Sequence, residues 1–347
     1  MVKKSSIKDV AELAGISVTT VSLILNNKGD RFSKETISKV HAAQKELNYL
    51  PDYFAQGMTA KTTKTIGVLV PDINNPFFSK FTQGVEEVAT DADFIPLIYN
   101  VGMNNKKVSY YLKELVRRTV DGFIIAAPNV APDIIQKYLQ VNQVPYITLD
   151  QSSVTSNEKN QIKAGDYEGG ISATNYLLKH HHERIGIILP SEPANNIKER
   201  FNGYTDALLK AKITPRKEWI IKKELSKKGG YQAAAEVIRS GVTAVFAVND
   251  EMAIGLYRGL KEYGKSIPED ISIIGYDNID WCDYVQPRLT TIRQSIVEIG
   301  QVATELLLTQ IQHPNVEQEV VNLSTNLIER ESVRDIQEEL NEKNSSN

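Results

Sequence analysis

The sequence of 347 residues contains a single cysteine, Cys282, only two tryptophans and no long hydrophobic run. One cysteine excludes an internal disulfide framework and is typical of a reducing compartment, so we expect Cys282 to be a plain packed residue. No segment approaches the ~18 apolar residues of a membrane-spanning helix, and the charged start MVKKSSIKDVAELAG lacks the apolar stretch of a signal peptide. The sequence therefore predicts a cytoplasmic protein without membrane contact.

An excess of charge of one sign is also lacking, since the net charge is only −3. The two parts of the chain differ, however: residues 1–61 carry nine Lys and Arg against six Asp and Glu, and the remainder carries 31 against 37. A mildly basic head is compatible with nucleic-acid binding, although a solvated surface explains the same excess. The length and the 41% hydrophobic content are sufficient for two or three domains.

Residues 1–50 have the pattern of a small helical domain. Gly15 favours a left-handed helix end, Ser17 can cap a second helix, and Ser33 can cap a third. Apolar residues recur at helical spacing before that glycine, at Ile7, Val10, Ala11 and Ala14. The pattern predicts a helix-turn-helix followed by a third helix, with an ordinary three-helix bundle as the alternative.

The second helix of this head has two kinds of side chain. We expect apolar residues to face the first helix, at Val18, Val21, Ile24 and Leu25. We expect the others to point outward at least in part, at Thr19, Thr20, Ser22, Leu23 and Asn26. Short hydroxyl and amide side chains allow a helix to approach phosphates and base edges closely.

From Thr65 onward, apolar runs of four to six residues alternate with amphipathic segments, which predicts an α/β body with parallel sheets. The runs are TIGVLVPD, FIPLIYN, VDGFIIAAP, VPYITLD, RIGIILP, EWIIKKEL, AVFAVND and ISIIGYDN. They form two series of strands, which indicates two similar halves with a change from one to the other near residue 162. Polar residues at the ends of strands, Asp72, Asp150, Asn249 and Asp277, would collect at the crevice where such sheets bind ligands.

Other patterns do not indicate a catalytic or metal site. The adjacent His180, His181 and His182 cannot all face one metal from a helix, so we interpret KHHHERIG as a solvated helix end. No spacing of a nucleophile, a phosphate loop or a metal cluster accompanies the acidic residues. We therefore predict no enzyme activity, no metal and no cofactor. Residues 333–347 have too few apolar turns for a coiled coil and are predicted to be a flexible tail.

Several separate motifs in this chain resemble those of the LacI/GalR family of bacterial transcription regulators. The first are IKDVAELAGISVTTVSLILNN and LNYLPDYFAQGMTAKTTKTIGVLVPDINNPFF. The body adds VDGFIIAAP, FAVNDEMAIGLYRGLKEYGKSIPEDISIIGYDN and QPRLTTIRQ, so the resemblance covers roughly residues 6–331. It implies a repressor of a sugar-utilisation operon that binds double-stranded operator DNA as a homodimer and senses a small effector in a core like that of periplasmic binding proteins.

The resemblance also implies a division of the chain. The helix-turn-helix domain would occupy residues 1–50 and the hinge residues 51–62. The core, residues 63–332, would contain two doubly wound parallel-sheet subdomains. The N-subdomain would comprise about 63–162 and 292–324, and the C-subdomain about 163–291 and 325–332.

In the family, the second helix enters the major groove, and the resemblance assigns its contacts to residues of this chain. The positions that choose bases match Val18, Thr19 and Leu23, and those that bind phosphates match Ser6, Ser17, Thr20 and Asn26. Many relatives have Arg where this chain has Leu23. A leucine can contact a thymine methyl but cannot make the bidentate contact of Arg to guanine, so the preferred operator would change. The alternative is that Leu23 is buried against the third helix.

The segment DYFAQGMTAK resembles the family's hinge, a short helix that inserts apolar side chains into the minor groove at the operator centre. The matching residues are Ala55, Gln56 and Met58. Met58 is apolar and flexible, so the wedge is retained, while Gly57 costs a helix about 1 kcal/mol. We expect a hinge that folds only on DNA; a simple linker is the alternative.

The segment DINNPFFSKF places Asn75, Phe77 and Phe78 at a strand-to-helix junction, as in ribose-binding proteins and ribose-operon repressors. There, aromatic rings sandwich a sugar and Asn bonds a hydroxyl, which agrees with the C–H faces and hydroxyls of a sugar. Without the family match, the two phenylalanines would be plain core. The same resemblance assigns effector contacts to Asp150, Asp166, Arg200, Asn249, Asp277 and Gln294.

Two departures from the ribose-binding pattern bear on the effector. Gln151 stands where ribose-binding proteins carry Arg, and Asp166 stands where they carry Asn. Ribose or a related pentose is the first expectation. A purine, a nucleoside or another sugar is the alternative, and a solute-binding protein for transport is a more distant one. The resemblance does not give the sign of the response, which is release or corepression.

Overall fold

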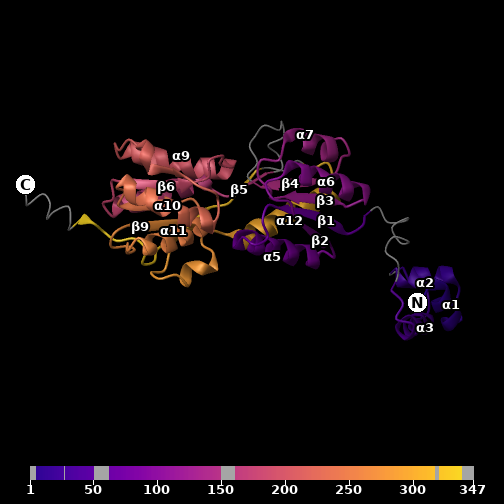
Figure 1. Cartoon of the computed structure of the whole chain (residues 1–347). Helices are drawn as coiled ribbons and strands as arrows, with labels where there is room; N and C mark the ends of the chain where they lie inside the picture. Colours follow the sequence, from indigo (N-terminus) through magenta and orange to yellow (C-terminus); the bar gives the residue numbers. More distant parts are fainter. Residues whose placement is uncertain (1–4, 27, 51–61, 150–160, 317–319, 338–347) are drawn as a thin grey trace, which may run out of the picture. The chain divides into compact units, whose positions relative to one another are not determined.

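The computed structural model describes residues 5–26, 28–50, 62–149, 161–316 and 320–337 (Figure 1). The chain divides into two compact units, one ending at Thr63 and the other starting at Lys64. No helix in these described ranges is long and apolar enough to cross a membrane. The hinge positions Ala55, Gln56 and Met58, and the effector position Asp150, lie outside the described residues.

The first unit is the predicted helix-turn-helix with its third helix. Helices α1 (Ile7–Ala14), α2 (Val18–Leu25) and α3 (Lys34–Glu46) follow one another along the chain. Gly15 ends α1 with a φ of +67°, and the Ser17 hydroxyl accepts a hydrogen bond from the N–H of Thr20 at the start of α2. The three helices share one buried cluster, which contains Val10, Ala11, Val21, Ile24, Val40 and Ala43.

The second unit starts with an α/β half that we call the N-half. Its sheet has the strand order β11-β5-β4-β3-β1-β2, and every neighbouring pair is parallel. The strands are β1 (Thr65–Val70), β2 (Ile95–Asn100), β3 (Gly122–Ile125), β4 (Tyr146–Leu149), β5 (Gln161–Lys163) and β11 (Val321–Asn322). The helices are α5 (Pro76–Asp91), α6 (Asn105–Arg117), α7 (Pro132–Ile135), which continues into a π-helical turn at Gln136–Gln140, and α12 (Ile296–Gln312).

The remaining elements form the C-half. Its sheet has the order β12-β10-β9-β8-β6-β7. The strands are β6 (Ile185–Leu189), β7 (Ile220–Lys222), β8 (Ala244–Ala247), β9 (Ser272–Asp277), β10 (Thr290–Gln294) and β12 (Thr325–Ile328). The helices are α8 (Asp166–Lys179), α9 (Asn195–Lys210), α10 (Lys227–Ser240) and α11 (Asp250–Glu262).

One strand of the C-half departs from the parallel arrangement. β12 pairs with β10 in the antiparallel sense, with Gln294 opposite Thr325 and Thr291 opposite Ile328. The chain leaves this sheet at the end of β10, forms α12 and β11 in the N-half, and returns directly into β12. Because β12 starts beside the point at which β10 ends, the two strands must run in opposite directions.

Helices cover both faces of each sheet, which explains the buried strands. In β1, Ile66, Val68 and Val70 belong to the cluster beneath α5 and α12, whereas Leu69 belongs to the cluster beneath α6. This alternation is the two-residue period of a strand buried on both sides. In the C-half, α8 packs on α9 and α10 packs on α11. Because the helices cover the faces of the sheet, the carboxyl ends of the parallel strands remain open.

The three histidines after α8 are not the solvated helix end that we predicted. His182 is 1% exposed. Its Nε2 donates to the carbonyl of Arg334 and its Nδ1 accepts from the hydroxyl of Thr243, at 3.1 and 2.9 Å. The first residues of the predicted flexible tail are likewise held, since Ile336 is buried and its N–H donates to the carbonyl of His180.

Candidate functional site

In the head, α2 presents the residues that the resemblance assigns to base recognition. Val18 is 40% exposed, so the prediction that it packs on the first helix is wrong. Thr19 is exposed and Leu23 is half-buried. The structure packs eight partly buried hydrophobic residues on the cluster of the head, and Leu23 is not among them. This position favours a surface role for Leu23 over burial against α3.

The residues assigned to phosphate contacts lie at the starts and ends of the short helices. Ser6 caps α1, and Ser17 caps α2, where its hydroxyl also lies 2.9 Å from the hydroxyl of Thr20. Asn26, at the end of α2, donates to the hydroxyl of Ser22 at 3.4 Å. A serine hydroxyl has one donor, which is the part that a phosphate oxygen can accept from. The Ser6 hydroxyl already donates to Asp9 Oδ2 at 2.7 Å, whereas the Ser17 donor is available when Thr20 donates to Ser17.

A cavity of about 750 Å³ lies within the second unit, between the two halves. Its N-half wall follows the carboxyl ends of β1, β2, β3 and β4, at Pro71, Gly102, Ala126 and Leu149. Its C-half wall follows the ends of β6 and β7. The cavity therefore occupies the crevice at which open parallel sheets bind ligands.

Three predicted effector residues line this cavity together. Asn75 caps α5, since its Oδ1 accepts from the N–H of Phe77 at 2.9 Å. Phe77 and Phe78 follow, with ring centroids 4.9 Å apart and ring planes at 75°. Phe77 is 9% exposed and packs with Phe78 on the core of the N-half. Asn75 uses its amide oxygen to cap the helix. The two N–H donors of the same amide can therefore bond a ligand.

Four other predicted residues form a buried polar network in the C-half. Arg200 donates from Nε to Asp166 Oδ1 at 2.7 Å and from Nη1 to the carbonyl of Val248 at 2.6 Å. Its Nη1 also lies 3.7 Å from Asp277 Oδ1, which accepts from Gln294 Nε2 at 2.7 Å. Gly170 permits this geometry, since a Cβ there would lie 2.3 Å from the carbonyl oxygen of Arg200. The tight packing of α8 on α9 thus places Arg200 beside Asp166.

The charges of this network are unequal, because one guanidinium faces two carboxylates. Burial raises the pKa of Asp277 to about 8, and the charges of Asp250 and Asp166 act in the same direction. Burial also raises the pKa of Asp166, against the opposing effect of Arg200. The Arg200 guanidinium lies 3.7 Å from the centroid of the Tyr276 ring, and its acidic neighbours hold its pKa high. The site thus contains a fixed cation, one paired carboxylate and one carboxyl that can donate or accept a proton.

The structure does not bring all the predicted residues to one surface. Asn75, Phe77 and Phe78 line the cavity of about 750 Å³, whereas Asp166 lines a second cavity of similar volume, about 780 Å³, beside the crossovers between the halves. The two cavities share Asn196. The other predicted residues, Arg200, Asn249, Asp277 and Gln294, are each 4 or 5% exposed and line neither cavity. Asn249 caps α11 by accepting from the N–H of Met252 at 2.9 Å.

The sequence analysis did not identify much of the C-half wall of the cavity that Asn75, Phe77 and Phe78 line. That wall includes Pro190, Ser191 and Glu192 after β6, and Lys222, Lys223, Glu224 and Leu225 at the end of β7. Their position directly after two apolar runs was the available signal. Among the residues described, no cluster of His, Cys, Asp and Glu is arranged to hold a metal ion.

Comparison with protein families assigns both parts of the chain. Residues 6–52 match the model of bacterial regulatory proteins of the lacI family, and residues 174–333 match a periplasmic binding protein-like domain. A curated relative, the HTH-type transcriptional repressor PurR of Photobacterium profundum, is 35% identical over 338 residues, which cover 96% of this chain and 99% of that protein. The PurR repressor of Vibrio atlanticus is 36% identical over 333 residues, covering 95% of this chain and 99% of that one.

Solved structures give the same assignment. A LacI family transcriptional regulator from Enterococcus faecium with bound ribose is 43% identical, with a TM-score of 0.73, over 79% of this chain and all of that one. The Lac repressor dimer bound to operator and the anti-inducer ONPF is 27% identical, with a TM-score of 0.86, over 96% of this chain and all of that one. The chain therefore belongs to the lacI family of bacterial regulatory proteins and is a DNA-binding transcriptional repressor.

Proposed function

We propose that this repressor binds a near-palindromic operator as a homodimer and is released by a small sugar, ribose or a related pentose, so that it controls a sugar-utilisation operon. The observation that carries the effector assignment is the cavity of about 750 Å³, into which Asn75, Phe77 and Phe78 open together. Cavities of ~300–1,000 Å³ are typical of small-molecule sites. The 43% identity to a regulator with bound ribose supports the same choice.

The chemistry of the two walls suits a polyhydroxyl ligand. Phe77 and Phe78 offer ring faces and edges to the C–H face of a sugar, and the amide of Asn75 offers donors to a hydroxyl. From the other half, Asp277 and Arg200 would bond hydroxyls once the halves close on the ligand. Asp150, Asp166, Asn249 and Gln294 complete the proposed set. Carboxylates and guanidinium groups together can satisfy the adjacent hydroxyls of one ring.

On the DNA side, Val18, Thr19 and Leu23 would contact base edges in the major groove. Ser6, Ser17, Thr20 and Asn26 would hold the register through phosphates. Two heads in a dimer would read half-sites about 34–36 Å apart or a multiple of this spacing. Ala55, Gln56 and Met58 would enter the minor groove between the half-sites.

Release follows if ribose binds one arrangement of the halves and the operator binds another. The effector can lower operator affinity only by the difference between its own affinities for the two arrangements. A ligand that prefers the operator-binding arrangement would instead act as a corepressor. We propose release; the walls of the cavity lie on different halves and would meet on a ligand in either case.

Calorimetric titration of the full-length protein with D-ribose tests the effector assignment. Asn75→Asp keeps a side-chain oxygen that can cap α5 but removes the amide donors, so ribose affinity should fall by about tenfold, the worth of one lost hydrogen bond. Asn142→Ala is the control, because Asn142 donates to the carbonyl of Tyr138 at 2.9 Å and neither residue lines the cavity. Purines, nucleosides and hexoses are titrated in parallel. Heat from one of these and none from ribose would assign the cavity to that ligand and reject ribose.

A further inference from the structure

Asp277, which we propose as an effector-binding residue, has a strained backbone. Its φ is +113°, and the next residue, Asn278, has a φ of +58°. Side chains other than glycine rarely adopt such values, and the strain persists only where surrounding contacts fix it. Asp277 ends β9 at the edge of the sheet that faces the other half. The direction of its carboxyl therefore depends on contacts to the residues after Asp277 as well as on Gln294, which donates to Asp277 Oδ1.

One set of contacts comes from the start of α11. Asp250, fully buried, accepts from the N–H of Ile279 at 2.9 Å, from Sγ of Cys282 at 3.1 Å and from the hydroxyl of Thr291 at 2.6 Å. Gly275 makes room for it, since a Cβ there would lie 2.2 Å from Asp250 Oδ1. Asp250, which also accepts from the backbone N–H of Asn278, thus fixes the backbone from Asn278 to Cys282. The side chain of Asn278 is bonded by Arg330.

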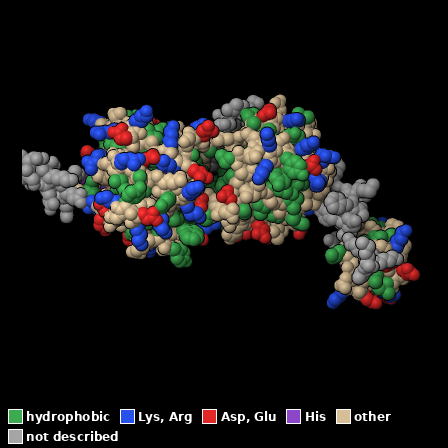
Figure 2. All heavy atoms as spheres, in the orientation of Figure 1, with side chains coloured by type: hydrophobic (Ala, Val, Ile, Leu, Met, Phe, Trp, Pro, Cys, Tyr) green, Lys and Arg blue, Asp and Glu red, His purple; other side chains and the backbone are tan. Residues whose placement is uncertain are grey.

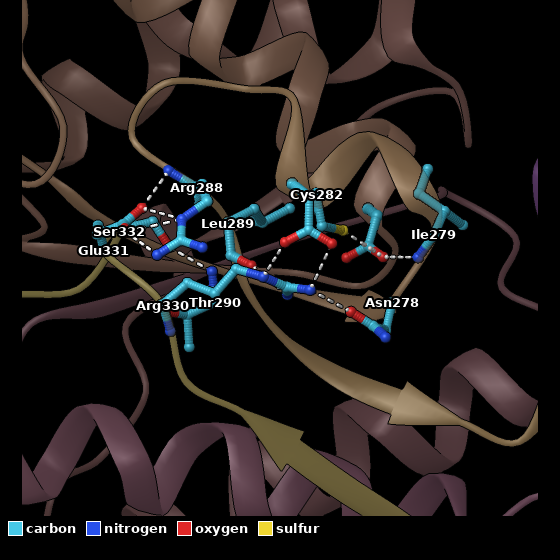
Figure 3. Close-up of polar contacts among 11 residues, drawn as sticks. Asn278, Ile279, Cys282, Arg288, Leu289, Thr290, Arg330, Glu331 and Ser332 are labelled. Carbon is cyan, nitrogen blue, oxygen red and sulfur yellow. Dashed lines mark hydrogen bonds and ion pairs between the residues drawn. The ribbon is translucent and has the colours of Figure 1, made fainter.

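The second set comes from Arg330, just beyond the end of β12 (Figure 3). Its Nη2 donates to Asn278 Oδ1 at 2.9 Å, and its Nη1 donates to the carbonyl of Leu289 at 2.9 Å. Its Nε and Nη2 also contact the two carboxylate oxygens of Asp283 at 2.8 and 3.1 Å. The Arg330 side chain is 10% exposed. One planar guanidinium thereby joins both ends of the loop from Asn278 to Leu289.

The backbone around Arg330 is itself held by hydrogen bonds to the sheet of the C-half. The N–H of Arg330 donates to the hydroxyl of Thr290. Two residues later, the buried Ser332 accepts from the N–H of Thr290 (Figure 3). Its hydroxyl donates to the carbonyl of Ile273 on β9. A guanidinium presents five donors in a fixed fork, so it can serve an amide, a carbonyl and a carboxylate at the same time. Lysine has the charge but not this geometry.

We propose that Arg330 is a positioning residue for effector recognition: through Asn278 it holds Asp277 in its strained backbone conformation, in which Asp277 Oδ1 accepts a hydrogen bond from Gln294. Arg330 does not line the cavity of about 750 Å³ and is not expected to touch the effector. The inference rests on the proposed function, because it requires Asp277 to bind the sugar. It extends the site to the last strand of the chain, since residues that support a ligand group often matter nearly as much as the group itself.

The test compares Arg330 with a neighbouring arginine. Arg330→Gln removes the charge and the fork, Arg330→Lys restores the charge alone, and Asn278→Gly keeps the positive φ while removing the acceptor. Arg288→Gln is the control, because Arg288 pairs with Glu331 on the same segment without contacting Asn278 (Figure 3). Each full-length variant is measured for the dissociation constant of D-ribose, for operator affinity without ribose, and for its thermal midpoint.

The ribose dissociation constant should rise about tenfold or more for Arg330→Gln and Asn278→Gly, the scale on which loss of a supporting partner acts at ligand sites. Arg330→Lys should recover part of the loss. Arg288→Gln should bind ribose like the wild type, and operator affinity without ribose should stay within about twofold for all variants. This separation distinguishes positioning from general stabilisation.

Equal ribose affinities for Arg330→Gln and Arg288→Gln would overturn the proposal. If Arg330→Gln does not fold, Asn278→Gly decides, and wild-type ribose affinity in that variant would also overturn it. A wild-type protein that binds no ribose would reject the proposed effector and this inference with it. A wild type that binds ribose while both the Arg330→Gln and Asn278→Gly variants match it would reject the inference alone.

Discussion

We propose that Leu23, which stands where the resemblance places Arg in many relatives, helps to set the operator preference of this repressor. It lies half-buried on α2, outside the packed cluster of the head. We expect Leu23→Arg to change the preferred base at one position of each half-site, because Arg can bond guanine at two points and Leu cannot. The change should be worth ~1–3 kcal/mol between favoured and disfavoured bases. Binding to a library of operator variants measures it.

Thr20→Ala serves as the comparison for Leu23→Arg. Thr20 bonds the capping Ser17 and is assigned to a phosphate, so its loss should weaken binding to most sequences alike. If both substitutions reduced binding equally on every sequence, the division between base and phosphate contacts would be wrong.

Arg200 should contribute strongly to stability. Its side chain is 4% exposed and pairs with Asp166, with Asp277 close by. Removing one partner of a buried pair typically costs ~3–5 kcal/mol, because the other charges stay buried without compensation. We expect Arg200→Ala to lower the free energy of unfolding by about that amount in urea denaturation.

Arg258→Ala gives the baseline for the Arg200 prediction. Arg258 pairs with Glu262 one turn away on an exposed helix surface, with 72% of the Arg258 side chain exposed. Because solvent screens such an exposed pair, its contribution to the free energy of unfolding is small. If Arg200→Ala cost no more than Arg258→Ala, the buried network would not be an ionic one.

The candidate residues differ in how far sequence could identify them. Asn75, Phe77 and Phe78 follow β1 directly, so one local motif placed all three at the cavity. Arg200, Asp277 and Gln294 come from separate elements, and their mutual bonds depend on helix packing that no local pattern specifies. Sequence also could not separate the capping role of Asn249 from a ligand role, because an amide at the start of a helix suits both.

At the scale of elements, hydrophobic period predicted the long strands and helices. The runs TIGVLVPD and ISIIGYDN became β1 and β9 because continuous apolar runs are typical of strands covered on both faces. The strands β5, β11 and β12, with the sequences QIK, VN and TNLI, contain no continuous apolar run that would mark them as strands. They form around the crossovers, so their pairing depends on the whole fold. The antiparallel direction of β12 has the same origin.

His182 makes the connection between α8 and the C-terminal segment sensitive to pH. Burial lowers the pKa of His182 to about 4, from an ordinary value of 6.5. A depressed histidine pKa stabilises the fold fully above pH 6.5, and this contribution is lost as pH falls toward 4. Between pH 7 and pH 5 the free energy of unfolding should fall by about 2 kcal/mol through this group alone.

The variant His182→Gln isolates that contribution, since glutamine does not titrate. The variant should be less stable than the wild type at pH 7, and the difference between the two should shrink toward pH 5. His181→Gln is the control, because His181 is partly exposed and pairs with Asp335. Parallel stability curves for His182→Gln and the wild type from pH 7 to pH 5 would contradict the assignment.

At the scale of the whole molecule, two kinds of recognition occur in separately folded units. The head presents α2, and the core contains a cavity bounded by both halves. Charged side chains of both signs are interspersed over the visible face of the core (Figure 2), in keeping with its small net charge. The +3 charge of residues 1–61 thus favours the head as the part that approaches DNA.

The measurement that tests the central claim is operator binding with effector added. The DNA is a duplex selected from random sequences by the full-length protein, and salt is held constant because phosphate contacts make affinity depend on it. We expect the selected site to be near-palindromic. We expect D-ribose or a related pentose to release the protein from it, and purines or nucleosides not to do so. Specific binding that no pentose changes would contradict the effector assignment and direct attention to Asp166 and Gln151, where this chain departs from ribose-binding proteins.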